Sequence, residues 1–162
     1  MTVDIEGVAL HLAHADELAI QWVGQEELMR QLLAAWMVVD EQDLPMNPRL
    51  LGKPGVGKTT LAYAAGKRMG RDVYILQATL DTRPEDLLVT PVIEGDGSLR
   101  YVASPLVTAM IRGGIAIIDE GTRMSEKSWP LSRRCLIIGV MSSPSLPGLK
   151  SRRIPISAWL PR

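Results

Sequence analysis

Eight consecutive residues, Gly52–Thr59, constrain the fold of this 162-residue chain more than any other segment. They read GKPGVGKT and match the pattern G-x-x-x-x-G-K-[ST] in full. Glycines at this spacing allow a tight turn that brings several backbone N–H groups onto phosphate oxygens. A helix that starts at the loop directs its positive end at the same phosphates. The pattern therefore predicts a phosphate-binding loop between a strand at 49–51 and a helix at 58–69, with Gly70 as the helix stop.

The loop residues and the one that follows are the candidate nucleotide-binding residues. They are Gly52, Lys53, Pro54, Gly55, Val56, Gly57, Lys58, Thr59 and Thr60. We expect the Lys58 ammonium to reach the β- and γ-phosphates of ATP, and the Thr59 hydroxyl to be a ligand of Mg²⁺. ATP and Mg²⁺ are thus the expected cofactors.

A second motif, IAIIDE, lies about 60 residues after the loop. Its four apolar residues predict a buried strand at 115–118, so Asp119 should emerge at the carboxyl end of the sheet, beside the loop. The Asp119 carboxylate is a candidate Mg²⁺ residue, and Glu120 is placed to orient and polarise an attacking water. Glu120 and Lys58 are therefore the candidate catalytic residues. The Asp-Glu pair favours hydrolysis over transfer to a second substrate.

Strand and helix signals alternate along the rest of the chain, which predicts an α/β fold with a parallel sheet covered on both faces. A strand is expected at 73–77, a turn into a helix at 81–88 with Thr82 as its cap, a hairpin over 89–103, and a helix at 105–112 between Ser104 and Gly113.

The first 39 residues give weaker signals. Residues 1–15 show no firm period, whereas 16–39 has helical spacing. The apolar face of that predicted helix consists of Leu28, Leu32, Ala35, Trp36 and Val39. Trp22 and Trp36 are expected to pack in the core or between subunits.

Composition excludes several classes of protein. No apolar run approaches the ~20 residues that cross a bilayer, so no membrane association is expected. A single cysteine, Cys135, excludes an internal disulfide framework and fits the cytoplasm. Net charge is −7 up to Glu126 and +7 from Lys127 onward. Nucleic-acid binding by this basic end is not expected, because its Pro and Ser residues are not interleaved with aromatic stacking positions.

Three further segments, QATLDTRPEDLL, YVASPLVTAMIRGG and IAIIDEGTRMSEKSW, follow the loop in order. With the loop they resemble the MoxR-type branch of the AAA+ ATPases over about residues 20–129. The resemblance implies an α/β nucleotide-binding core, hexameric rings, and ATP-driven remodelling of a partner protein complex. It also implies a partner with a von Willebrand factor A domain. By the same resemblance, Lys58 and Thr59 are nucleotide and Mg²⁺ residues, Asp119 is the metal-side acid and Glu120 the hydrolytic base.

The chain departs from that family because it shows no recognisable sensor strand, arginine finger or helical lid. Three functions therefore remain open: an ATPase motor module, an ATP-binding fragment with little or no turnover, and a small-molecule kinase. An arginine finger alone is worth on the order of 10³-fold or more in rate.

We divide the chain into an N-terminal helical lead-in at 1–45, an AAA+ core at 46–129 and a basic tail at 130–162. The resemblance stops at Trp129, and acidic residues are absent from there on. Back-translated and read one base earlier, the tail can give a family-like run that ends in FRVVAT. We therefore interpret the tail as a shifted-frame translation that leaves the parallel sheet incomplete at its C-terminal end.

Overall fold

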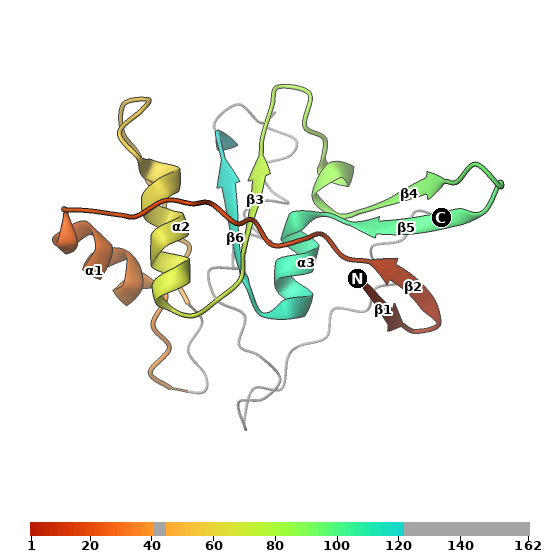
Figure 1. Ribbon diagram of the computed structural model, residues 1–162, viewed down its shortest axis with the longest axis horizontal. Helices are drawn as coiled ribbons and strands as arrows, with labels where there is room; N and C mark the ends of the chain where they lie inside the picture. Colours follow the sequence, from red (N-terminus) through yellow and green to blue (C-terminus); the bar gives the residue numbers. More distant parts are fainter. Residues whose placement is uncertain (41–44, 122–162) are drawn as a thin grey trace.

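The computed structural model describes residues 1–40 and 45–121, which form an α/β fold with two sheets (Figure 1). The strands are β1 (Thr2–Ile5), β2 (Val8–His11), β3 (Val73–Gln77), β4 (Val89–Ile93), β5 (Leu99–Ala103) and β6 (Ile115–Asp119). The helices are α1 (Glu26–Ala35), α2 (Lys58–Arg68), the 3₁₀ turn η1 (Pro84–Leu87) and α3 (Pro105–Arg112). None of the helices in these two ranges combines the length and the apolar character needed to cross a bilayer.

A parallel pair of strands, β3 and β6, lies at the centre of the fold. Their register runs from Val73↔Ile115 to Gln77↔Asp119, and α2 and α3 cover its two faces. Ile115 and Ile117 pack on the α2 side, in one core with α1. Ala116 and Ile118 pack with α3 on the other side. The predicted α/β fold with a parallel sheet and flanking helices is confirmed. Among the described residues, β6 pairs with β3 alone.

The close approach of α2 to this sheet depends on Gly66. A Cβ atom at Gly66 would lie 2.6 Å from Val73 Cγ2 and 3.2 Å from Ile115 Cδ1. Both of these residues are fully buried. Glycine here lets the helix that begins at the phosphate loop lie directly against the strands.

The second sheet, which we call the accessory sheet, has the strand order β1-β2-β5-β4. The β4–β5 hairpin is the predicted one, but the β1–β2 hairpin was missed. Its signal is an alternation of apolar residues around a turn at Glu6 and Gly7, whose φ angles of 54° and 82° suit a two-residue hairpin turn. Parallel pairing of β2 with β5 joins the two hairpins.

A segment that we call the strap, residues 12–22, crosses from the accessory sheet over the central strands to α1 (Figure 1). The predicted helix over 16–39 is therefore wrong in its first ten residues, and it is also wrong after Ala35, where α1 ends. Gly24 and Gln25 take left-handed φ angles of 85° and 47°, so the helix begins only at Glu26.

Hydrogen bonds hold the strap in place. Ala13 N–H donates to Thr108 Oγ1 at 3.0 Å and Leu18 N–H to Tyr63 Oη at 2.8 Å. Asp16 bonds twice to the free side of β3, because its N–H donates to Val73 O at 2.8 Å and its carboxylate accepts from Ile75 N–H at 2.6 Å. The strap thus closes the edge of β3 that β6 leaves open.

The buried face of α1 also differs from the predicted one. Met29, Leu32 and Trp36 are buried, whereas Leu28 is 45% and Val39 80% exposed. Only Leu32 and Trp36 of the predicted face therefore reach the core.

Two shorter elements differ from prediction. Residues 49–51 form no ladder with any described residue, so the expected strand is absent from the described part. The helix expected within 81–88 is the single 3₁₀ turn η1. Thr82 does not cap it, since its hydroxyl accepts from Thr79 N–H at 2.7 Å, and Asp86 instead accepts from Arg83 N–H at 2.8 Å.

Candidate nucleotide-binding site

The glycine loop leads directly into α2, as its sequence predicts. Gly55 and Gly57 have φ angles of 78° and 84°, a region that residues with side chains rarely adopt. Gly57 is the residue before the helix, and no side chain caps the helix there. The first turn also has no acidic residue that would compete for its N–H groups. These features leave the positive end of α2 available to an anion.

Two side chains at the start of α2 face different partners. Lys58 Nζ turns back to the loop and donates to Gly52 O at 3.1 Å and Lys53 O at 2.8 Å. Thr59 Oγ1 donates to Asp119 Oδ2 at 2.8 Å. This bond joins the loop to the end of β6, so two motifs 60 residues apart in the sequence meet at one point.

Glu120 follows Asp119 immediately, in an unusual backbone conformation. Its φ angle is 53°, and its N–H donates to Asp119 Oδ1 at 2.9 Å. Left-handed conformations in residues other than glycine cost on the order of 1–3 kcal/mol and cluster at functional sites. Glu120 is exposed, and its left-handed conformation ends the extended backbone of β6.

Gln77 is a polar residue of this edge that sequence reasoning missed. It is the register partner of Asp119 on the neighbouring strand. Since paired residues of parallel strands share a face, Gln77 lies on the α2 side of the sheet with Asp119. The sequence signal for Gln77 is its place as the polar last residue of the VYILQ strand. This strand has the same length as IAIID, so the two polar ends are paired.

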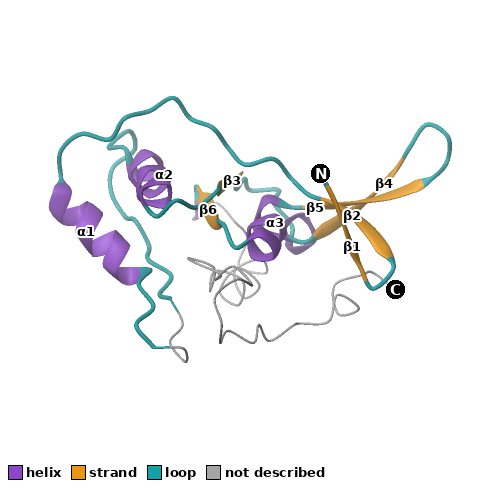
Figure 2. Ribbon diagram, turned by 60° about the horizontal axis from the view of Figure 1, so that its bottom comes forward, coloured by secondary structure: helices purple, strands orange, loops and turns teal. Residues whose placement is uncertain are grey.

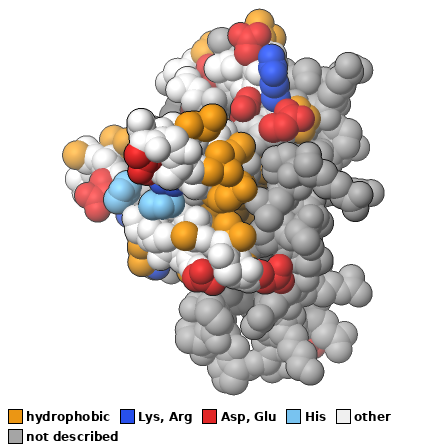
Figure 3. Space-filling model, turned by 90° about the vertical axis from the view of Figure 1, so that its right-hand side faces the viewer, with side chains coloured by type: hydrophobic (Ala, Val, Ile, Leu, Met, Phe, Trp, Pro, Cys, Tyr) orange, Lys and Arg blue, Asp and Glu red, His pale blue; other side chains and the backbone are white. Residues whose placement is uncertain are grey.

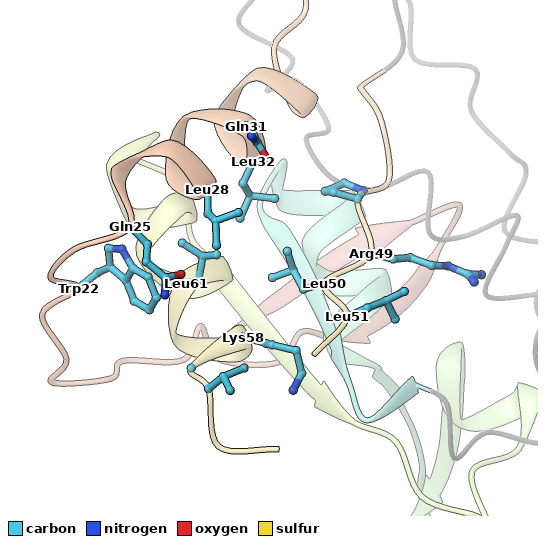
Figure 4. A pocket seen from close by; sticks show the side chains of 13 residues that line it. Trp22, Gln25, Leu28, Gln31, Leu32, Arg49, Leu50, Leu51, Lys58 and Leu61 are labelled. Atoms are coloured by element: carbon cyan, nitrogen blue, oxygen red, sulfur yellow. The ribbon is translucent and has the colours of Figure 1, made fainter. Parts of the chain in front are cut away.

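A pocket of about 430 Å³ adjoins the loop. In Figure 4, Leu28, Leu32, Leu50 and Leu61 converge on its interior, and Lys58 lies at its border. The full lining is Trp22, Gln25, Leu28, Gln31, Leu32, Pro48, Arg49, Leu50, Leu51, Val56, Gly57, Lys58 and Leu61. A mostly apolar pocket with a few polar side chains next to a cation is typical of a small-molecule site.

Trp22 connects the strap to this pocket. Its ring lies 3.3 Å from the point where a Cβ of Gly57 would be. The indole Nε1 is buried and finds no acceptor among the described residues. A buried donor without a partner is uncommon, because leaving it unpaired is costly. Trp22 was predicted to pack either in the core or between subunits. It packs against the core and also borders the pocket.

The structure brings Lys58, Thr59, Asp119 and Glu120 to one edge of the sheet. The loop residues from Gly52 to Val56 are exposed, and Gly57 to Thr60 are partly buried. The described residues hold no group of three or more acidic, His or Cys side chains suited to a metal. The predicted tail at 130–162 and the end of the predicted core lie outside the described residues.

The α/β fold and its glycine loop define a class of protein, the P-loop nucleotide-binding proteins. Within that class, residues 49–130, about half of the chain, match the family described as AAA domain (dynein-related subfamily). The chain belongs to this family. The prediction of an AAA+ ATPase is therefore confirmed at this level, while the MoxR-type branch stays a prediction.

Two curated relatives are both named Holliday junction branch migration complex subunit RuvB. The one from Pseudothermotoga lettingae is 29% identical over 122 residues, which cover 75% of this chain and 31% of the relative. The one from Kosmotoga olearia is 28% identical over 105 residues, which cover 64% of this chain and 26% of the relative. The chain thus spans less than a third of the length of these relatives.

Proposed function

We propose that this chain binds ATP with Mg²⁺ and hydrolyses it as a module that remodels or activates a partner protein complex. The observation that carries the proposal is the 2.8 Å hydrogen bond between Thr59 and Asp119. It joins the start of the helix, where a phosphate would bind, to a carboxylate at the end of a buried strand. The groups that would bind phosphate and the groups that would bind the metal ion are therefore adjacent in one site.

Thr59 and Asp119 are suited to hold Mg²⁺. Mg²⁺ prefers oxygen ligands and usually takes one or two carboxylates together with substrate phosphates and water. A hydroxyl and a carboxylate already in contact match that preference. When bound, the ion would neutralise charge on the phosphates.

We propose that the adjoining pocket binds the base of the nucleotide. We place the base between Trp22 and the leucines of α1 and α2, because flat aromatic rings bind well among apolar side chains. Trp22 Nε1 would find its acceptor on the ligand or on a water beside it. Lys58 would exchange its two carbonyl partners for phosphate oxygens.

Glu120 is the proposed general base, since its carboxylate follows the metal-side acid and is exposed to water. Gln77 is a proposed neighbour that could hold this carboxylate or the attacking water by its amide. The backbone strain at Glu120 supports a functional role for its position.

The finer parts of the proposal follow the resemblance to the MoxR-type branch. They are a hexameric ring, a partner with a von Willebrand factor A domain, and a cytoplasmic location. The runner-up is an ATP-binding fragment with little or no turnover.

We also keep the proposal that residues 130–162 are read in a shifted frame. It rests on the sequence, in which the family resemblance stops at Trp129 and no acidic residue follows. Sequencing the gene past its stop codon tests this directly. Absence of a strand-forming, family-like continuation in the neighbouring frame would contradict it.

A pair of variants tests the main proposal. Lys58→Ala should weaken binding of a fluorescent ATP analogue strongly, because it removes the cation that meets the phosphates. Glu120→Gln should leave binding intact and abolish any hydrolysis, because it keeps the size of the side chain and removes the base. Tight binding by Lys58→Ala would contradict the loop assignment. ATP binding without turnover in the parent, with or without a phosphate acceptor, would favour the runner-up.

A further inference from the structure

The accessory sheet has one face made almost entirely of apolar residues. Residues that alternate along both hairpins share this face, as the ladders fix their registers. They are Val3, Ile5, Val8 and Leu10 from the first hairpin and Val89, Pro91, Ile93, Leu99, Tyr101 and Ala103 from the second.

Helix α3 covers only part of this face. Its Val107 and Ile111 pack against the core formed by Leu10, Val89 and Ala103. Toward the turn of the second hairpin the face is open to solvent, because Ile93 is 75% and Leu99 53% exposed. Figure 3 shows a band of hydrophobic side chains on this side of the molecule.

The two hairpins diverge at the open end. The β2–β5 ladder consists of only Leu10↔Tyr101 and His11↔Val102, and beyond it the strands separate (Figure 2). At this open end β2 and β5 form no ladder with each other, and the apolar face is exposed around Ile93 and Leu99. An exposed apolar face beside strand backbone of this kind suits an extended segment, which can add main-chain hydrogen bonds to side-chain contacts.

Acidic residues lie near this open end, although Asp4 is on the face of β1 opposite Val3 and Ile5. Asp4 and Glu6 belong to the first hairpin and its turn, and Glu94 and Asp96 belong to the second. Arg100 is the one Lys or Arg of these two hairpins, and it is paired with Glu94 at 2.9 Å. The pKa of Asp96 is lowered by hydrogen bonds from Ser98, so this carboxylate stays charged. Complementary charge would favour a basic occupant.

We propose that this open end of the apolar face binds an extended, basic segment of a partner protein in which apolar side chains alternate with Lys or Arg. The apolar side chains would cover Ile93 and Leu99, and the basic ones would face the carboxylates of the two turns. The site lies apart from the nucleotide loop and is joined to it by the strap.

A fluorescently labelled synthetic peptide of alternating leucine and lysine is a suitable probe, measured by anisotropy without nucleotide. The parent chain should bind it, and rising salt should weaken the binding. The variant Ile93→Ser with Leu99→Ser should bind at least about tenfold more weakly, because exposed apolar anchors carry most of the affinity of such contacts. Val92→Ser is the matched control, since Val92 lies on the opposite face of β4 and is 37% exposed.

Three results would overturn the proposal. One is equal affinity of the parent and the double variant, with both folded by circular dichroism. Another is equal binding of a peptide with glutamate in place of lysine. The third is a parent dimer that the double variant abolishes in sedimentation, because the occupant would then be a second copy of the chain. Lys58→Ala should bind the peptide as the parent does, so the result is independent of the proposed ATPase function.

Discussion

Replacing Gly66 by alanine sets two opposite effects against each other. Glycine in a helix interior costs roughly 1 kcal/mol relative to alanine, so helix propensity alone predicts that Gly66→Ala stabilises the fold. The new methyl group would lie 2.6 Å from Val73 Cγ2, however, and contacts this short do not occur between unstrained atoms.

The packing effect should win. Val73 and Ile115 are both 0% exposed, so neither can turn into solvent to make room. Overfilling a packed core typically costs about 1–3 kcal/mol. After the gain in helix propensity, we expect a net loss of up to about 2 kcal/mol, which in a chain of this size lowers Tm by several degrees. Because α2 carries Lys58 and Thr59, binding of an ATP analogue should weaken as the helix moves off the sheet.

Thermal and urea unfolding of four proteins measure this: the parent, Gly66→Ala, Val73→Ala and the double variant. Val73→Ala removes the clashing Cγ2 atom, so the double variant should lose at least about 1 kcal/mol less than the sum of the single losses. A higher Tm for Gly66→Ala would refute the argument. Strict additivity would show that the contact between the helix and β3 is not the cause.

Two further predictions concern the strap and α1. Asp16→Ala leaves the Ile75 N–H unpaired at the edge of β3, so we expect a loss of about 1–3 kcal/mol and faster amide exchange at Ile75; unchanged exchange would contradict the role of the strap. The hydrogen bonds from Arg68 at 2.9 Å lower the pKa of Glu26. The stabilisation by these bonds is therefore present above the pKa of Glu26 in the unfolded chain, and it is lost as pH falls through the lowered pKa of the folded chain. Glu26→Gln should thus be less stable than the parent at neutral pH and as stable as the parent in acid. A constant difference across that range would count against the pair.

The sequence predicts the central elements well, because their signals are local. Gly57 precedes α2, Gly70 lies just after its end, and Gly113 ends α3. Ser104 caps α3 by accepting from Val107 N–H at 3.1 Å, as a Ser-Pro start predicts. The IAII run forms a strand whose two faces meet helices, and within it Ile115 is fully buried while the other three residues are partly buried.

The errors concern segments whose structure depends on distant contacts. Residues 1–11 form strands because β2 pairs with β5, about 90 positions later in the chain. Residues 16–22 are not helical although their spacing suits a helix, because Asp16 and Leu18 bond to β3 and α2. The local spacing of apolar residues carries no information about contacts with residues distant in the sequence. Such tertiary contacts therefore override the local preference.

The strap also changes how the candidate site is understood. The site residues of the two motifs could be chosen from the sequence, because their spacing and chemistry are specific. The pocket could not, since its Trp22 wall comes from a segment predicted to be helical. One continuous stretch of chain now runs from the accessory sheet, across the edge of β3, to the ring that lies against Gly57.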